Sequence, residues 1–251
     1  MIAWLGTAAA SDPLVVGGKG ATLSRLASTF EVPRGFVVAG EPDALDDALA
    51  QLDEPFAVRS SALAEDGATA SFAGQHETVL GVLRADVRAA IEACRASVDA
   101  AAAYRAQHGL QRESEIPVLV QSLLAADVAA VAFTVDPVTH ADTHVVVNAS
   151  YGLGEAIVSG TVTPDTYRVA GDVVEVQIGA KERMSIRTAD GVRDVDVPRL
   201  LRTSRALDDN EARAIARLAL DVERTLGFPV DVECAFAGGQ LYLLQARPVT
   251  A

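Results

Sequence analysis

Residues 230–248 read VDVECAFAGGQLYLLQARP, two apolar runs joined by a short stretch that contains adjacent glycines. This pattern predicts a β-hairpin. Both runs also carry polar side chains, Asp231 and Glu233 in the first and Gln245 and Arg247 in the second. Burying such groups is costly unless they pair with one another or hold a ligand. The hairpin therefore predicts both a sheet and a candidate ligand site.

The register of this hairpin decides whether the four polar residues meet. Strand residues alternate between two faces, and directly opposed residues share a face. A two-residue turn would place Glu233 opposite Leu244 and would send Gln245 to the other face. A loop of three or five residues centred on Gly239 would place Glu233 opposite Gln245, with Leu244 facing the core. We predict the longer loop, because it collects all four polar side chains on one face and because glycine suits a bulged three-residue loop.

Outside the hairpin, the pattern alternates between helices and strands. Apolar residues at helical spacing predict helices over residues 86–107 and 208–227. Shorter apolar runs predict strands over residues 35–40, 56–61, 116–124, 129–137 and 144–150, and a further hairpin over residues 167–179. These elements predict an α+β protein with mainly antiparallel strands, divided into residues 1–112 and 113–251.

Two glycine-containing stretches open predicted helices. The first, GGKG at 17–20, contains Lys19 and follows a short strand or turn over 14–16; the second, GLG at 152–154, precedes Glu155. Glycines let backbone N–H groups approach an anion at a helix start. The alternatives are a tight turn with a solvated lysine, and an acidic residue that simply complements a helix dipole. The first stretch lacks the spacing of a P-loop.

Arg59 and the hairpin residues add phosphate and metal chemistry. Arg59 ends an apolar run, and the Ser-, Ala- and Gly-rich residues 60–74 after it are typical of a flap over a ligand, or of an ordinary surface loop. Carboxylate and amide oxygens, as in Glu233 and Gln245, suit Mg²⁺, and a guanidinium such as that of Arg247 suits phosphate. A plain surface ion pair is the alternative for the hairpin set.

Composition and charge exclude several classes of function. The 251 residues include 34 acidic and 21 basic ones, for a formal net charge of −13, which argues against a nucleic-acid or anionic-membrane partner. We find no signal peptide and no apolar run of the ~20 residues that a membrane helix needs. Cys94 and Cys234 are expected to be buried thiols in a reducing cytoplasm, and the four histidines show no zinc spacing.

Taken in chain order, several stretches resemble the nucleotide-binding domain of the phosphoenolpyruvate synthase, pyruvate phosphate dikinase and rifampicin phosphotransferase family. The resemblance runs from Trp4 to Pro248, and its most specific stretches are VGGKGATLSRLA, FAVRSSALAED, NASYGLGEAIVSGTVTPDTY and GFPVDVECAFAGGQLYLLQARP. It implies an ATP-grasp fold, in which two α+β subdomains with mainly antiparallel sheets clamp ATP.

The resemblance also implies roles for individual residues. The residues it marks as catalytic are Arg247, which would meet the transferred phosphoryl group, and Lys19 and Arg59, which would contact phosphates. Main-chain groups of Gln121, Ser122 and Leu123 would hold adenine, and Glu155 would lie near the ribose. The metal-holding positions are Glu233 and Gln245, with Asp231 beside them. ATP and Mg²⁺ are the implied cofactors.

Two departures from the family bear on the acceptor. The larger enzymes continue into a swivelling domain that carries a phosphorylated histidine, and none of the four histidines here has that sequence context. The segment 39–55 is also shorter than its counterpart in the family. Three functions follow: an enzyme that phosphorylates or activates a small-molecule acceptor with MgATP; a nucleotide-binding subunit that passes phosphate to a histidine on a partner protein; and a non-catalytic nucleotide-binding module. The intact charged set favours the first two.

Overall fold

The computed structural model describes residues 1–41, 44–62, 78–106 and 116–249. The chain divides into two compact units, Met1–Leu123 with Ala189–Gly191, and Leu124–Thr188 with Val192–Ala251. The expected division after residue 112 is replaced by one after Leu123. The reason is that β5 (Val118–Ser122) lies between two strands of the first unit and hydrogen-bonds to both.

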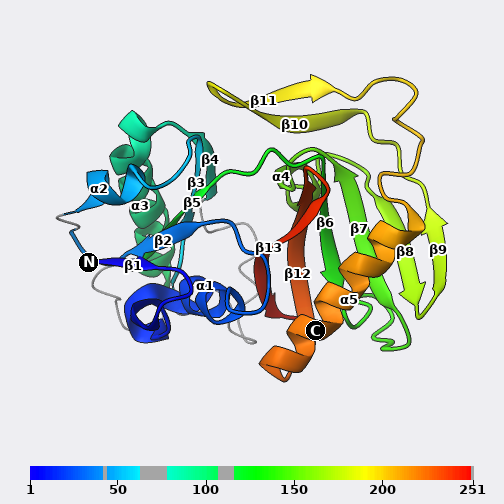
Figure 1. Ribbon diagram of the computed structural model, residues 1–251, viewed down its shortest axis with the longest axis horizontal. Helices are drawn as coiled ribbons and strands as arrows, with labels where there is room; N and C mark the ends of the chain where they lie inside the picture. Colours follow the sequence, from blue (N-terminus) through cyan, green and yellow to red (C-terminus); the bar gives the residue numbers. More distant parts are fainter. Residues whose placement is uncertain (42–43, 63–77, 107–115, 250–251) are drawn as a thin grey trace. The chain divides into compact units, whose positions relative to one another are not determined.

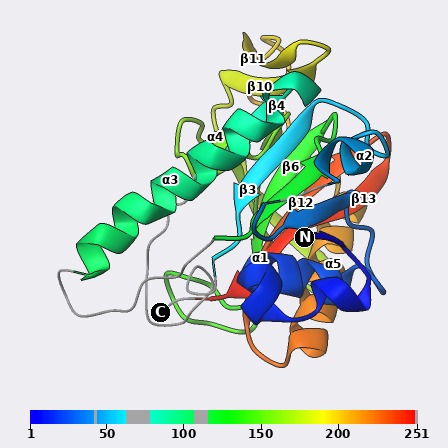
Figure 2. The same cartoon turned by 90° about the vertical axis from the view of Figure 1, so that its left-hand side faces the viewer.

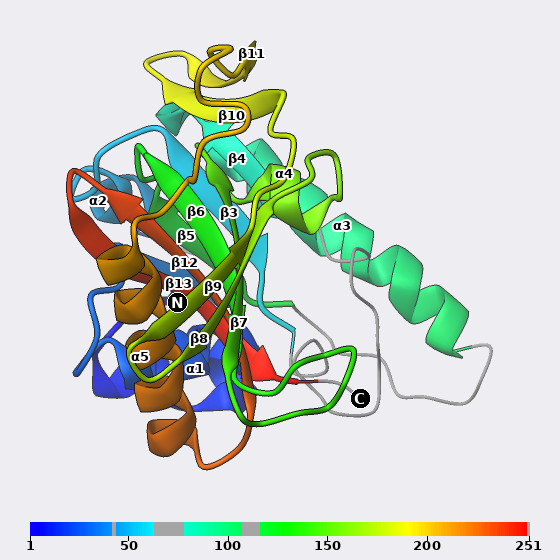
Figure 3. The ribbon, with the colours of Figure 1, turned by 90° about the vertical axis from the view of Figure 1, so that its right-hand side faces the viewer.

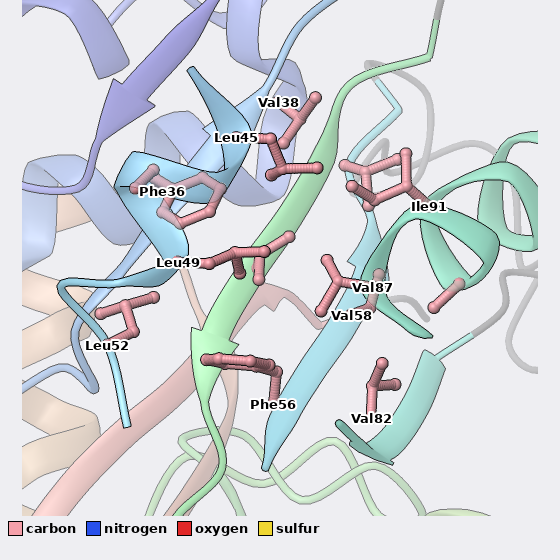
Figure 4. Close-up of a cluster of buried hydrophobic side chains, with 14 of the residues drawn as sticks. Phe36, Val38, Leu45, Leu49, Leu52, Phe56, Val58, Val82, Val87 and Ile91 are labelled. Atoms are coloured by element: carbon pink, nitrogen blue, oxygen red, sulfur yellow. The ribbon is translucent and has the colours of Figure 1, made fainter. Parts of the chain in front are cut away.

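The first unit is built on a five-stranded antiparallel sheet of order β1-β2-β5-β3-β4. Its other elements are β1 (Ile2–Trp4), β2 (Gly35–Val38), β3 (Phe56–Ser60), β4 (Thr78–Val82), α1 (Pro13–Leu26), α2 (Leu45–Leu49) and α3 (Val87–Ala106). Figure 2 shows α3 lying along β3 and β4. The core between this sheet and the helices α2 and α3 includes Phe36, Leu49, Phe56, Val58 and Ile91 (Figure 4).

The chain enters α1 differently from the expectation. Asp12 caps the helix by accepting a hydrogen bond from the Leu14 N–H at 3.0 Å, and Pro13 occupies the first helical position. Both residues favour a helix start, so residues 14–16 form a helical turn, and the prediction of a strand or turn entry there was wrong. Gly17, at φ 73° and ψ 172°, then breaks the helix into two parts.

The second unit is built on a six-stranded antiparallel sheet of order β13-β12-β6-β7-β8-β9 (Figure 1). Its strands are β6 (Val128–Phe133), β7 (Val145–Tyr151), β8 (Asp165–Ala170), β9 (Val173–Gln177), β12 (Val230–Ala237) and β13 (Gln240–Pro248). The helices are α4 (Glu155–Val158) and α5 (Asp209–Leu226). The expected α+β class with antiparallel strands is confirmed in both units.

One long helix, α5, covers one face of this sheet and contacts β6, β7, β8, β9 and β12 (Figure 3). Its start is a capping box: the Asp208 carboxylate accepts the Glu211 N–H, and the Glu211 carboxylate accepts the Asp208 N–H. The predicted C-cap, Gly227, adopts the left-handed conformation at φ 86°. The buried side of the helix consists of Ala212, Ile215, Ala216, Ala219 and Val222.

The β12–β13 hairpin has the predicted register at its polar end but a different turn. Glu233 lies opposite Gln245 and Asp231 opposite Arg247, as expected. The turn itself has only two residues, Gly238 and Gly239, both with positive φ, and the prediction of a longer loop was wrong.

A β-bulge reconciles the short turn with the polar register. Cys234 pairs with Leu243 and Glu233 with Gln245, so Leu244 is an extra residue in β13. An extra residue shifts the register by one and exchanges the two faces beyond it. Leu243, at 1 % exposure, therefore fills the core position that was expected for Leu244.

Four strands were not predicted from the sequence. Two are β1 and β4 at the edges of the first sheet, and two are β10 (Arg183–Thr188) and β11 (Gly191–Asp196), which form a separate two-stranded sheet. Charged residues interrupt the apolar alternation in β10 and β11, which hides the strand signal. In the part of the chain that the structure describes, no helix is both long and apolar enough to cross a bilayer.

Candidate functional site

The polar residues of the β12–β13 hairpin share one face of the six-stranded sheet. Asp231 and Arg247 form one opposed pair, and Glu233 and Gln245 form the next. Opposed residues face the same side of a sheet. The alternate residues Val232, Cys234, Leu243 and Ala246 are each at most 2 % exposed and form the apolar face. The sheet therefore presents one apolar side and, at β12 and β13, one polar side.

Asp231 and Arg247 form a tight ion pair. The Arg247 guanidinium donates from Nε at 2.8 Å and from an Nη at 2.7 Å, both to Oδ2 of Asp231. Asp231 is only 5 % exposed. Burial raises the pKa of the Asp231 carboxyl, Arg247 opposes that rise, and the Glu233 carboxylate adds to it. Arg247 is thus the main group that opposes the effect of burial on this carboxyl.

The other oxygen of this carboxylate is buried and has no hydrogen-bond partner within the described part of the chain. Among the described residues, nothing donates a hydrogen bond to Oδ1 of Asp231, although the atom is buried. A buried acceptor without a partner is costly and points to a water, an ion or a ligand. Asp231 Oδ1 lies on the same sheet face as the side chains of Glu233 and Gln245. These hard oxygen donors fit Mg²⁺, which takes carboxylates and carbonyl oxygens together with water and phosphate.

Glu155 lies at the start of α4, behind the glycine segment 152–154. Within that segment, the Leu153 N–H donates to the Ser185 carbonyl of β10 at 2.8 Å. Gly152 has φ 77°, and a Cβ at this position would lie 2.3 Å from the same carbonyl oxygen. The segment therefore requires glycine where it passes β10. The Glu155 side chain is exposed in the first turn of α4.

In the first unit, Lys19 is buried rather than solvated. It is 6 % exposed, and its Nζ donates to the Ser60 carbonyl at 3.0 Å. Next to it, the Ser61 hydroxyl accepts from the Gly20 N–H at 2.8 Å and donates to the Val16 carbonyl at 2.7 Å. The glycine stretch is thus bound to the end of β3, and the alternative of a solvated lysine is wrong.

Arg59 directly precedes Ser60, whose carbonyl accepts the hydrogen bond from Lys19. It is half-buried in β3, opposite Leu119 of β5 and Thr78 of β4. Lys19 and Arg59 therefore lie at the same end of β3. Lys19 donates a hydrogen bond to the Ser60 carbonyl, and Arg59 is itself a residue of the strand. Of the expected flap over residues 60–74, residues 63–74 lie outside the described residues.

Three groups of the expected adenine hinge already donate hydrogen bonds within the protein. Gln121 is 4 % exposed, and its side-chain amide donates to the Pro33 carbonyl at 3.0 Å. The Ser122 N–H donates to Arg34 O at 3.0 Å, and the Leu123 N–H to Pro55 O at 2.9 Å. The Gln121 side chain is structural, and adenine recognition here would need backbone groups other than these two N–H donors.

Sequence reasoning missed two polar pairs in the second unit. Lys181 and Asp165 are both fully buried and bonded to each other. Asp136 accepts the N–H groups of Val138 and Thr139, which lower the pKa of its carboxyl to about 2, and lies 3.4 Å from the ring of His144. The only signal for the first pair was Asp165 inside the quoted stretch TVTPDTY; Lys181 stands in a polar run that shows no pattern.

The predicted residues fall into two groups, one in each unit. Lys19, Arg59 and the stretch 121–123 belong to the first unit, and Glu155 with the four hairpin residues belongs to the second. Within the second unit, the structure brings Asp231, Glu233, Gln245 and Arg247 together on one face.

Comparison with known families gives one match over most of the chain. The family described as "Pyruvate phosphate dikinase, AMP/ATP-binding domain" matches residues 42–251. This range includes every predicted site residue except Lys19.

Three similar curated proteins are much longer than this chain. "Uncharacterized phosphotransferase YvkC" of Bacillus subtilis is 36% identical over 241 residues, covering 90% of this chain and 29% of that protein. A "Probable phosphoenolpyruvate synthase" of Methanothermobacter thermautotrophicus is 38% identical over 239 residues, covering 92% and 35%. The "Rifampicin phosphotransferase" of Streptomyces sviceus is 38% identical over 215 residues, covering 82% and 25%. The chain thus spans a quarter to about a third of these relatives.

Among solved structures, D-alanine–D-alanine ligase from Bacillus anthracis in complex with ATP aligns with 98% of this chain and 58% of its own. The TM-score is 0.47 and the sequence identity 9%, a likeness too slight to bear on fold or function.

Proposed function

Because the chain belongs to the pyruvate phosphate dikinase AMP/ATP-binding domain family, we propose that it binds MgATP and acts in ATP-dependent phosphoryl transfer. One observation carries the proposal. Asp231, Glu233, Gln245 and Arg247 lie on one sheet face, and an oxygen of Asp231 is buried there without a partner among the described residues. A metal ion with a bound phosphate would satisfy that oxygen.

The residues divide into metal-holding and phosphate-holding groups. Glu233 and Gln245 would hold Mg²⁺, with Oδ1 of Asp231 as a third oxygen, and the ion would neutralise phosphate charge. Arg247 is oriented by Asp231 at 2.7–2.8 Å and would meet charge that develops on the transferred group. Phosphoryl transfer needs positioning and charge neutralisation more than covalent help from the protein.

The first unit would contribute further contacts to the nucleotide. Lys19 and Arg59 would contact its phosphates, and main-chain groups near residues 121–123 would contact adenine. Lys19 is held by the Ser60 carbonyl at 3.0 Å, so its ammonium is pre-oriented. Glu155, exposed at the start of α4, would lie near the ribose.

The first experiment measures MgATP binding by isothermal titration, with Arg247→Ala and a control, Arg193→Ala, on the exposed side of β11. We expect Arg247→Ala to lower kcat by about 100-fold or more and to weaken MgATP binding far less, because its charge is needed most in the transition state. Arg193→Ala should change neither quantity. An unaltered protein that does not bind millimolar MgATP would contradict the proposal.

The acceptor is either a small molecule or a histidine on a partner protein. We favour a small-molecule acceptor, as the simplest use of the proposed MgATP site. Phosphorus NMR of products formed with candidate acceptors tests the first. An acid-labile phosphate on a separate protein, formed only with this chain and MgATP, would establish the second.

A further inference from the structure

The Lys181–Asp165 pair lies at the centre of a fully satisfied polar cluster. Both side chains are 0% exposed. Asp165 Oδ1 accepts from the Lys181 ammonium and from the Gly179 N–H at 2.8 Å. Its other oxygen accepts from the Ala206 N–H at 2.7 Å and from the Tyr167 hydroxyl at 3.3 Å.

Stability alone does not account for this pair. Burying two charges costs desolvation energy that their attraction barely offsets, and apolar replacements of buried ion pairs are often neutral or stabilising. Such a pair does, however, fix geometry, because each charge tolerates few arrangements of its partners. The question is therefore what the pair holds in place.

Lys181 connects the cluster to the end of β7. Its Nζ lies 5.8 Å from the centre of the Tyr151 ring, within the range of a cation–π contact. The Tyr151 hydroxyl donates to the Arg205 carbonyl at 3.0 Å. Tyr151 immediately precedes the glycine segment 152–154 and Glu155.

Lys181 also anchors the strand against which the glycine segment packs. It is four residues before Ser185, whose carbonyl accepts the Leu153 N–H at 2.8 Å. The Lys181 N–H donates to the Arg202 carbonyl at 3.0 Å, and this hydrogen bond joins the two ends of the segment that contains β10 and β11. The glycine segment is thus held from one side by Tyr151 and from the other by Ser185.

We propose that Lys181 is a positioning residue for the nucleotide: fixed by Asp165, it holds Tyr151 and the start of β10, and so sets the place of Glu155. The inference rests on the proposed function, because Glu155 matters only if a nucleotide binds beside α4. Lys181 itself is fully buried, so its role is to position other groups.

The main test compares Lys181→Met with the unaltered protein by isothermal titration of MgATP. Methionine keeps an unbranched side chain but removes the positive charge that pairs with Asp165 and lies over the Tyr151 ring. We expect the Kd for MgATP, and the KM, to rise about tenfold, with kcat per folded molecule nearly unchanged, since a displaced contact weakens positioning. The amide of Leu153 should exchange its hydrogen faster even without nucleotide.

A second variant perturbs the contact between the glycine segment 152–154 and β10 without changing Lys181 or Asp165. In Gly152→Ala, the new Cβ would lie 2.3 Å from the Ser185 carbonyl and push the segment away from β10. The matched control is Gly160→Ala, because Gly160 also has positive φ, 69°, but has nothing within 4 Å of a Cβ. Gly152→Ala should weaken MgATP binding as Lys181→Met does, Gly160→Ala should not, and the double variant should lose less than the sum.

The outcomes separate this inference from the proposed function. If Lys181→Met folds, loses stability and still binds MgATP with unchanged Kd, Lys181 is only structural and the inference is overturned. If Lys181→Met does not fold, unchanged binding in Gly152→Ala overturns it equally. Failure of the unaltered protein to bind MgATP instead refutes the proposed function, and Leu153 exchange then decides whether Lys181 holds the segment.

Discussion

At the residue scale, burial and the charge of Arg247 shift the pKa of the Asp231 carboxyl in opposite directions. Because burial raises the pKa of this carboxyl, the folded protein binds this proton more tightly than the unfolded chain does. The contribution of Asp231 to stability is therefore greatest at low pH. It falls as pH rises from about 4, the unfolded pKa, through the folded pKa.

Asp231→Asn should remove this pH dependence. From about pH 4 to about pH 7, the free energy of unfolding of the unaltered protein should fall relative to that of Asp231→Asn. Urea unfolding at several pH values, without metal or nucleotide, measures the difference. A relative gain for the unaltered protein over the same range would show that Arg247 outweighs burial at this carboxyl.

Gly17 is a described residue where the backbone leaves no room for a side chain. A Cβ there would lie 1.3 Å from the Ser61 carbonyl oxygen, and φ is 73°. Gly171 also has positive φ, 60°, but has nothing within 4 Å. Gly171→Ala should cost about 1–2 kcal/mol of left-handed strain. Gly17→Ala should cost more than about 3 kcal/mol, because the backbone of Ser61 must also move.

Urea unfolding of both glycine variants shows whether the steric contact with Ser61 adds to the cost of a positive φ at Gly17. Equal losses of stability would mean that conformational strain alone explains Gly17, and that the contact with Ser61 adjusts without cost.

At the scale of elements, α5 depends on its first turn. The capping box of Asp208 and Glu211 satisfies N–H groups that the helix leaves open. Asp208→Ala should lower the free energy of unfolding by about 1 kcal/mol. Asp221→Ala removes an acid near the other end of the helix, where it forms an exposed ion pair with Arg224, and should cost less than about 0.5 kcal/mol.

Chemical denaturation of the two α5 variants measures both effects. Equal losses, or a larger loss in Asp221→Ala, would mean that the cap does not control the stability of this helix.

At the scale of the whole molecule, the two units have separate sheets and separate internal contacts. The single tryptophan, Trp4, lies in the first unit, so its fluorescence reports on that unit. Asp208→Ala acts in the second unit. It should move the unfolding transition seen by far-ultraviolet circular dichroism more than the transition seen by Trp4 fluorescence. Two transitions that coincide and move together would show a single cooperative unit.

The sequence by itself determined the class of fold, the main helices and the polar face of the hairpin. Apolar spacing located α3 and α5, and the register that we predicted for the hairpin placed Asp231, Glu233, Gln245 and Arg247 on one face. These features are local: helical and strand periodicities, caps and costly buried charges are legible in short windows. The resemblance in several stretches then pointed to the family that the match over residues 42–251 shows.

Only the tertiary structure decided how the hairpin reaches its register. The two-residue glycine turn alone would have separated Glu233 from Gln245, and the bulge at Leu244 restores their pairing. A bulge is chosen by the core, which accepts Leu243 and Ala246 together, and no local pattern encodes that choice. Likewise, the burial of Lys19 and the pairing of Lys181 with Asp165 join segments distant in sequence, so packing across the fold determined them.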